Sequence, residues 1–186
     1  SMTPKKVMHR RRYNILNVDL RHTAVALQDK KIVNSCDTIN ILKKNMHPSI
    51  EFNISNVKLI GVCVNDLDSL NEVEMIIKLL INLHYNVKLR VHDADSRYRV
   101  IQKLSEKYKT PIESAKSTHI VDYLNKVDLV ICGNSNVLID AVKHKTPVVY
   151  YWNGDQALYD YYGIVRYFKL TTARSKEDLK SIFLEK

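Results

Sequence analysis

The sequence lacks the features that mark a membrane-spanning, fibrous or disulfide-bonded protein. No apolar run approaches the ~20 residues that a membrane-spanning helix needs, and there is no internal repeat and no low-complexity tract. The three cysteines, Cys36, Cys63 and Cys132, are odd in number and have no CxxC spacing. Two of them lie in apolar segments, so we expect buried free thiols in a reducing compartment, no disulfide and no zinc. We therefore expect a globular, cytoplasmic protein.

The common signatures of nucleotide sites and hydrolases are also missing. With only four glycines, the chain has neither the GxGxxG dinucleotide fingerprint nor the GxxxxGK[ST] phosphate loop. It has no GxSxG nucleophile elbow, and its histidines are scattered without metal-ligand spacing. We expect no metal and no resident cofactor.

What the sequence does contain is a regular alternation of strand-like and helix-like segments. Buried parallel strands read as continuous apolar runs, and helices show apolar residues at a spacing of three or four. Ser69, followed three residues later by Glu72, predicts a capping box at one helix start. The expected strands are residues 57–64, 86–92, 112–115, 128–132, 147–152 and, less sharply, 165–169. The expected helices are residues 69–83, 95–109, 119–125, 135–144, 156–162 and 176–184, the last with Ser175 as its N-cap. This alternation predicts an α/β fold: a Rossmann-like three-layer αβα sandwich with a mostly parallel sheet.

The first part of the chain follows this rhythm less clearly. We expect residues 1–48 to be a basic extension or the remnant of a partner domain, with a strand over residues 13–20 and a helix over residues 21–31, and residues 49–186 to form the main domain. The net charge of +9 includes a cluster of basic residues near the start. That cluster is either a solvated tail or a contact for an anionic membrane surface at the inner membrane face or an acidic glycan. Nucleic acid is not expected, because no known binding motif or aromatic interleaving accompanies it. The unusual start, Ser1-Met2, suggests a piece of a longer protein.

Ligands of open parallel sheets bind at the carboxyl ends of the strands, so these ends are where a site is expected. Gly133 lets a ligand approach the backbone, Asn134 tolerates an unusual turn, and Ser135 and Asn136 begin a helix. The free amides and positive end of that helix suit a phosphate. The alternative is that Ser135 only caps the helix.

A second strand end carries a cation and an imidazole. Arg90 and His92 are two residues apart and so face the same side of a strand. Arg90 could fork onto a phosphate, and His92 is the candidate catalytic residue, assisting a leaving group near neutral pH. The alternative for His92 is an ordinary surface group. Asp66 and Asp68 are interpreted as turn and helix-start charges, and half or more of the aromatic residues near Trp152 as core.

Together these residues suggest a resemblance. The run VDLVICGNSNVLIDAVKHKTPVVYYW, followed by YDYYGIV, resembles the carboxyl-terminal, donor-binding half of bacterial glycosyltransferases with two Rossmann-like domains, the GT-B fold of capsule and lipopolysaccharide synthesis. The resemblance covers about residues 56–168. Sialyltransferase-like and glycerophosphotransferase-like members have an R-x-H-P strand end similar to Arg90-Val91-His92-Asp93. In this chain Asp93 replaces the proline, and Asn136 replaces the second serine of a Ser-Ser pair.

The resemblance implies a function and a division of labour. Ser135, with Asn134 and Asn136, would bind the phosphate of a nucleotide-sugar donor, and His92 the nucleotide or leaving group. A GT-B enzyme needs a second domain for the acceptor, so this chain is either the donor half of a longer enzyme, or acts with a partner chain, or is a small protein that has kept only that half. The leading hypothesis is the nucleotide-sugar-binding domain of an inverting glycosyltransferase of surface polysaccharide synthesis. The alternatives are half of a glycerophosphotransferase-like enzyme that uses a CDP-alcohol, and a non-catalytic interaction module.

Overall fold

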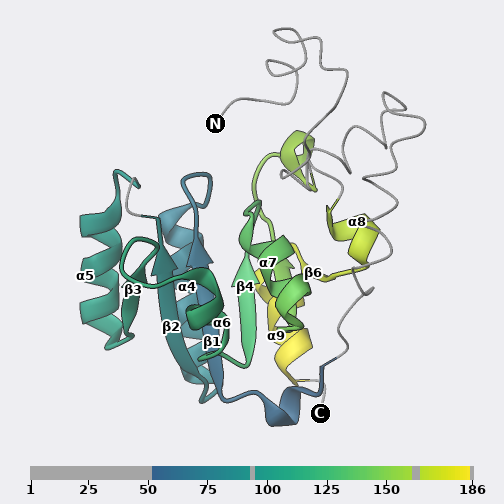
Figure 1. The fold of residues 1–186 in the computed structure, drawn as a ribbon, viewed down its shortest axis with the longest axis horizontal. Coiled ribbons are helices and arrows are strands. Elements are labelled where there is room, and N and C mark those ends of the chain that lie inside the picture. Colours follow the sequence, from purple (N-terminus) through teal and green to yellow (C-terminus); the bar gives the residue numbers. More distant parts are fainter. Residues whose placement is uncertain (1–51, 93–94, 161–163, 185–186) are drawn as a thin grey trace, which may run out of the picture.

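Six parallel strands form one sheet in the order β3-β2-β1-β4-β5-β6 (Figure 1). The structure is a computed structural model that describes residues 52–92, 95–160 and 164–184. The strands are β1 (Leu59–Val64), β2 (Asn86–Val91), β3 (Ile112–Ser114), β4 (Leu129–Cys132), β5 (Val148–Tyr151) and β6 (Thr171–Ala173).

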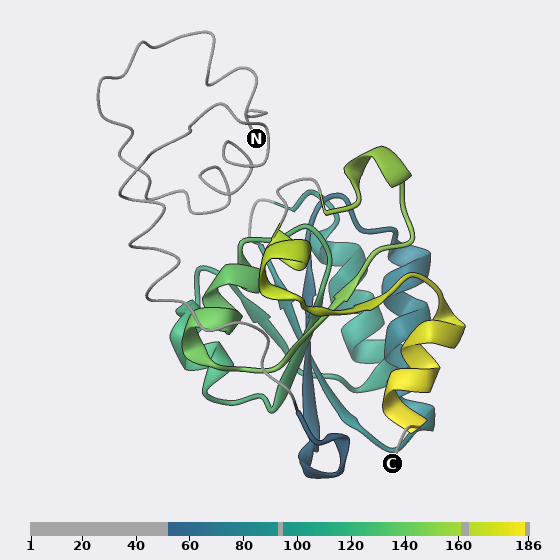
Figure 2. The ribbon, with the colours of Figure 1, turned by 90° about the vertical axis from the view of Figure 1, so that its right-hand side faces the viewer.

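Helices cover both faces of the sheet, which gives the three layers that the sequence predicts (Figure 2). Helices α4, α5 and α9 lie on one face, where α4 contacts both of the others, and α6, α7 and α8 lie on the opposite face. Their bounds are α4 (Leu70–Asn82), α5 (Tyr98–Tyr108), α6 (Ile120–Leu124), α7 (Val137–His144), α8 (Ile164–Phe168) and α9 (Lys176–Leu184). Two 3-10 turns, η1 (Ile54–Asn56) and η2 (Gln156–Leu158), complete the described elements. The prediction of a Rossmann-like αβα sandwich is confirmed, and all six strands are parallel.

The central strands are apolar on both sides because each side meets a helical layer. Val62 and Val64 of β1 belong to the core under α4, whereas Cys63 between them belongs to the core under α6 and α7. A strand buried on both faces needs apolar side chains at successive positions, which is why β1 and β4 read as continuous apolar runs.

The last part of the domain differs from the sequence prediction. The strand expected at residues 165–169 is helix α8, and the sixth strand is β6, which follows it. Asp160 explains the helix: its carboxylate accepts hydrogen bonds from the amides of Val165 (2.8 Å) and Arg166 (3.1 Å), as an N-terminal cap does. The helix expected at residues 156–162 is only the 3-10 turn η2 where the structure describes it.

The predictions for residues 13–20 and 21–31 lie outside the described residues, and so does the boundary at residue 48. Ser175 does cap α9, because its hydroxyl accepts a hydrogen bond from the Asp178 amide (3.0 Å).

One place in this topology is suited to a ligand. The strands β1 and β4 are neighbours, yet β1 is followed by α4 on one face and β4 by α7 on the other. Since the chain leaves the two adjacent strand ends in opposite directions, a crevice opens between them, and this switch point is where open α/β sheets bind their ligands.

Candidate functional site

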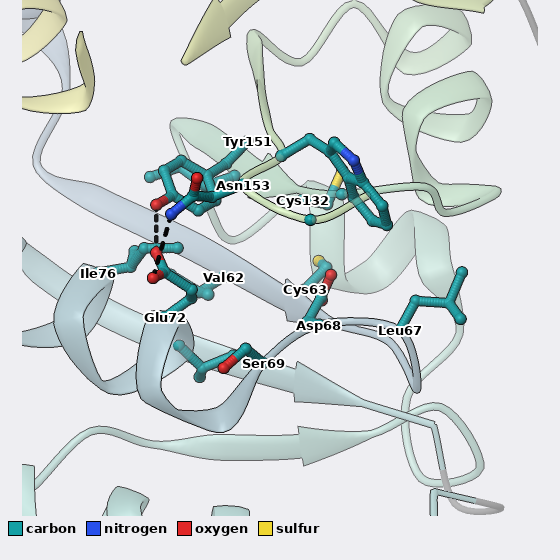
Figure 3. A pocket seen from close by; sticks show the side chains of 15 residues that line it. Val62, Cys63, Leu67, Asp68, Ser69, Glu72, Ile76, Cys132, Tyr151 and Asn153 are labelled. Atoms are coloured by element: carbon teal, nitrogen blue, oxygen red, sulfur yellow. Dashed lines mark hydrogen bonds between the residues drawn. The ribbon is translucent and has the colours of Figure 1, made fainter. Parts of the chain in front are cut away.

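A cavity of about 90 Å³ lies at the carboxyl ends of β1 and β4, at the switch point (Figure 3). Side chains from both strand ends, from the start of α4 and from the segment after β5 line it. Its polar lining is Asp68, Ser69, Glu72, Tyr151 and Asn153, together with the thiols of Cys63 and Cys132. We call this the switch-point cavity.

The turn between β1 and α4 forms one wall of the cavity and is held by its own side chains. The Asn65 amide donates to the Asp68 carboxylate (2.9 Å), and the Asn65 side-chain oxygen accepts from the Leu67 amide (2.7 Å). Local bonds of this kind are why Asn and Asp favour turns. The Asn65 side chain also donates to the carbonyl of Asn134 (3.2 Å), so this turn is tied to the loop after β4.

Arg97 clamps the same turn from the neighbouring strand end. Its guanidinium donates to the carbonyls of Asn65 (2.6 Å) and Asp68 and to the carboxylate of Asp95 (2.7 Å and 2.9 Å). The bond with Arg97 lowers the pKa of the Asp95 carboxyl. Arg97 therefore fixes one wall of the cavity, a role that the sequence did not suggest.

Asp68 is one of the two acidic residues that line the cavity. Its Oδ1 lies so close to Gly133 that a β-carbon on that residue would approach it to 2.7 Å. Burial raises the pKa of the Asp68 carboxyl to about 6. Asp68 does serve its turn, as the sequence interpretation held, but it also places a carboxylate inside the crevice.

Glu72 corrects the predicted capping box. Ser69 is the N-cap of α4, but its hydroxyl makes no cap hydrogen bond, and the Glu72 carboxylate accepts bonds from the Tyr151 hydroxyl and from the Asn153 side chain (3.3 Å) (Figure 3). Tyr151 is at the end of β5 and only 6% exposed, and a buried polar group needs a hydrogen-bond partner. The tertiary contact thus prevails over the local cap.

The segment after β5 closes the cavity with an aromatic ring. Trp152 is only 4% exposed, and its indole nitrogen donates to the carbonyl of Asp155 (3.0 Å). The Asp155 carboxylate accepts from the Ala157 amide (2.9 Å) and so caps η2. Tyr150, Tyr151 and Trp152 are core, as expected of half or more of the aromatic residues here, and the last two are also cavity wall. Tyr161 and Tyr162 lie outside the described residues.

The loop that the sequence singled out begins inside the cavity and then leaves it. Gly133 lines the cavity. The Asn134 side chain donates to the Leu158 carbonyl (2.7 Å) and accepts from the Tyr150 hydroxyl (3.0 Å), so it fixes the loop. The Ser135 hydroxyl accepts from the Val137 amide (3.3 Å), and Asn136 is exposed and caps nothing with its side chain. The Ser135 hydroxyl thus makes a local bond at the start of α7, and the loop brings the start of this helix to the rim of the cavity.

Arg90 and His92 are separated from that cavity. Arg90 is 7% exposed, and its guanidinium lies over the ring of Tyr123, 5.2 Å from the centroid, on the α6 side of the sheet. Its Nη1 is buried without a hydrogen-bond partner among the described residues. His92 follows the end of β2 and is exposed, and its carbonyl accepts from the Asp95 amide (2.9 Å). Neither side chain lines the switch-point cavity.

Cys63 and Cys132 are buried free thiols, as predicted; Cys36 lies outside the described residues. They are register partners on β1 and β4 and form part of the cavity floor. Burial raises the pKa of Cys63 to about 12 and that of Cys132 well above its usual value, so both are protonated thiols and poor nucleophiles.

Among the described residues, no group of three or more His, Cys, Asp or Glu side chains is arranged to hold a metal ion. No helix in the described part of the chain has the length and apolar character to cross a membrane.

Comparisons with known proteins add little to this geometry. No protein-family model and no curated protein matches the sequence. Among solved structures, a chain of the tetrameric eIF2B-beta2-delta2 complex from C. thermophilum is similar at 11% identity and a TM-score of 0.37. The match covers 73% of this chain and spans 57% of the length of the other. A likeness this distant carries no argument about function.

The residues that line the cavity are thus largely different from those that the sequence predicted for the site. Asp68 and Glu72 are neighbours at the start of α4, but Asn153 follows β5, about 80 residues later, and only the strand order brings it to them, so the three were not predicted to share a site. The signal that could have found them is the strand order β1-β4-β5, since it places the carboxyl ends of these strands side by side.

Proposed function

We propose that the described domain binds a nucleotide-activated sugar at the crevice between β1 and β4, as the donor-binding half of a glycosyltransferase of surface polysaccharide synthesis. The position of the switch-point cavity carries the proposal, because it lies where this sheet topology offers its one natural ligand crevice.

The start of α7 supports a role in phosphate binding. The loop Gly133–Asn136 runs from the cavity to the first turn of the helix. The first amides of a helix and its positive end attract an anion. In our proposal, Ser135 and Asn136 border the donor phosphate at this rim, and Asn134 holds the loop in shape.

Arg90 does not line the cavity, and it supports the proposal through the electrostatic effect of its positive charge. Its guanidinium lowers the pKa of the cavity thiol Cys63, against the larger effect of burial, so its positive charge is felt at the cavity wall. A fixed cation behind the site would stabilise the departing nucleotide phosphate as negative charge develops. His92 is proposed to donate a hydrogen bond or proton to that leaving group from the end of the adjacent strand β2.

The described part of the chain has one sheet, and the proposed reaction needs an acceptor site as well. We therefore propose that a second domain or a partner chain supplies it, and that the isolated chain binds a donor without transferring its sugar. The basic cluster at residues 5–12 would attract an anionic membrane surface or acidic acceptor in this account.

A thermal-shift screen against CMP, CDP, UDP, GDP and their sugars tests the proposal. A ligand present at ~100 times its dissociation constant adds ~2.7 kcal/mol of stability, so a nucleotide sugar should raise the melting temperature by several degrees. Stabilisation by CDP-glycerol alone would favour the phosphotransferase alternative.

Ser135→Ala sharpens this test, with Ser181→Ala as its matched control. Ser181 is an exposed helical serine whose hydroxyl donates to the Glu177 carbonyl (3.0 Å). We expect Ser135→Ala to weaken nucleotide binding severalfold, since it alters the helix start at the rim, and Ser181→Ala to leave binding unchanged. No shift with any nucleotide would favour a non-catalytic interaction module.

A further inference from the structure

The ionisable lining of the switch-point cavity is of one sign. Asp68 and Glu72 bring two carboxylates into it, and among the described residues no lysine, arginine or histidine lines it. Two arginines act electrostatically on the lining, but their guanidinium groups are engaged elsewhere, Arg97 with the β1–α4 turn and Arg90 over Tyr123. A phosphate or carboxylate inside this cavity would meet like charge at short range, which is strongly unfavourable away from bulk water.

The lining nevertheless offers hydrogen bonds of both kinds. Asp68 Oδ2 accepts one bond, from Asn65, and Oδ1 accepts none from the described residues, although a carboxylate can accept about four. The Ser69 hydroxyl makes no cap bond, so it can donate or accept. The Asn153 side chain adds an amide. Such a set suits hydroxyl groups, which both donate and accept, better than an ammonium group, which only donates.

The remaining lining is apolar and includes the Trp152 ring with Val62, Ile76 and Ile131. A sugar ring presents C–H groups on its faces and hydroxyls at its edge, so it matches a wall of this composition.

The crevice therefore has two different sides. The start of α7 and the buried Arg90 lie on one side of the sheet, and Asp68 and Glu72 with α4 on the other. We infer that the switch-point cavity holds the uncharged, hydroxylated sugar ring of the donor and excludes acidic sugars, while the phosphates stay outside it at the start of α7. This inference rests on the proposed function and names its donor class: neutral hexoses, and neither carboxylated sugars nor glycerol phosphate.

Matched donors that differ by a single carboxylate test the inference. UDP-glucose is compared with UDP-glucuronic acid, and GDP-mannose with GDP-mannuronic acid, by calorimetric titration of the full chain. In the pair whose nucleotide binds, the neutral sugar should bind about tenfold more tightly or better, as expected for one like-charge contact in a partly shielded site. Equal affinities within the pair, or binding of CMP-sialic acid or CDP-glycerol in preference to both neutral donors, would overturn the inference and leave nucleotide binding intact. Binding of no donor at all would defeat the proposed function itself.

Asp68→Asn tests whether Asp68 causes the preference for neutral over acidic sugars, and Asp66→Asn is its control. Asp66 is in the same turn, exposed, and does not line the cavity. We expect Asp68→Asn to reduce the preference for the neutral sugar to less than about threefold by removing one of the two charges, and Asp66→Asn to leave it unchanged. A preference that persists in the Asp68 variant and in Glu72→Gln would contradict the assignment to these carboxylates.

Discussion

The Asp68 carboxylate rests against the α-carbon of Gly133, where any side chain would come within 2.7 Å of its Oδ1. Asp68 lies in the turn that follows β1, and Gly133 directly follows β4, so only the pairing of these two strands brings the residues together. Gly133 thus gives room to an acidic side chain of the protein, in addition to any ligand that approaches its backbone.

Gly133→Ala should destabilise the domain by about 1–3 kcal/mol, the usual cost of overpacking. The added methyl group would meet Asp68 Oδ1 and, at 3.3 Å, the Tyr151 carbonyl. Denaturant unfolding measures the change. In a double-mutant cycle with Asp68→Ala, the cost of Gly133→Ala should fall, because the first clash is gone. Strict additivity of the two changes would contradict the contact.

The stability of the protein should depend on pH through Asp68. Its pKa is raised from 3.8 to about 6 in the folded state, so its protonated form favours folding. That contribution is complete below pH 3.8, declines between pH 3.8 and about 6, and is absent at neutral pH. Asp68→Asn, which mimics the protonated form, should be more stable than wild type at pH 7 by at most about 3 kcal/mol, since one pKa unit is about 1.4 kcal/mol.

This advantage should shrink as the pH falls toward 4. Other carboxyls act in the opposite sense, such as Glu74, whose pKa is lowered to about 2 by Tyr108 and Lys107. These other carboxyls are present in both proteins, so their effect cancels in the difference in free energy of unfolding between variant and wild type. Asp66→Asn is the control. If the difference in free energy of unfolding between Asp68→Asn and wild type stayed constant from pH 4 to 7, the raised pKa of Asp68 would be refuted.

The two cavity thiols should resist labelling in the native protein. Cys63 and Cys132 are buried, and the pKa of each is raised by that burial, so little thiolate exists to react. In a Cys36→Ser background, DTNB should modify both at least about a hundredfold more slowly than in the unfolded chain, because reaction then waits for opening. If DTNB modified the native protein as fast as the unfolded chain, the two thiols at the cavity floor would be accessible to solvent, which would contradict their burial.

Asn134 and Asn136 should differ sharply although they are two residues apart. Asn134→Ala removes bonds to the Leu158 carbonyl and the buried Tyr150 hydroxyl, at a cost of about 2–3 kcal/mol for groups left unsatisfied. Asn136 is exposed and makes no side-chain cap bond, so Asn136→Ala should change stability by less than about 0.5 kcal/mol. Equal costs in thermal unfolding would contradict the placement of Asn134.

The fold class could be predicted from the sequence because its signals are local. The apolar runs of β1 and β4 and the helical spacing of α4 depend on near neighbours in the chain, and the structure confirms them. Helix α8 was read as a strand because the residue that caps it, Asp160, precedes it by four positions and acts through its side chain.

The site was less accessible to sequence reasoning, and for a physical reason. Gly133 was found from its loop, but its partner Asp68 was read as a turn residue, and Glu72 as half of a capping box. The capping-box pattern and the preference for acidic residues at helix starts favour those two interpretations. The contacts that override them, with Gly133 and with Tyr151, depend on strand order, which no local pattern encodes.

The central claim, that the crevice between β1 and β4 is the ligand site, is tested most directly by an NMR titration. The ligand is the nucleotide sugar that stabilises the protein most in the thermal screen, and the observed signals are the backbone amides of the ¹⁵N-labelled chain. The account predicts that the largest shifts fall on the turn at residues 65–69 and the loop at residues 133–137. Shifts that cluster elsewhere on the sheet, or their absence at saturating ligand, would contradict it.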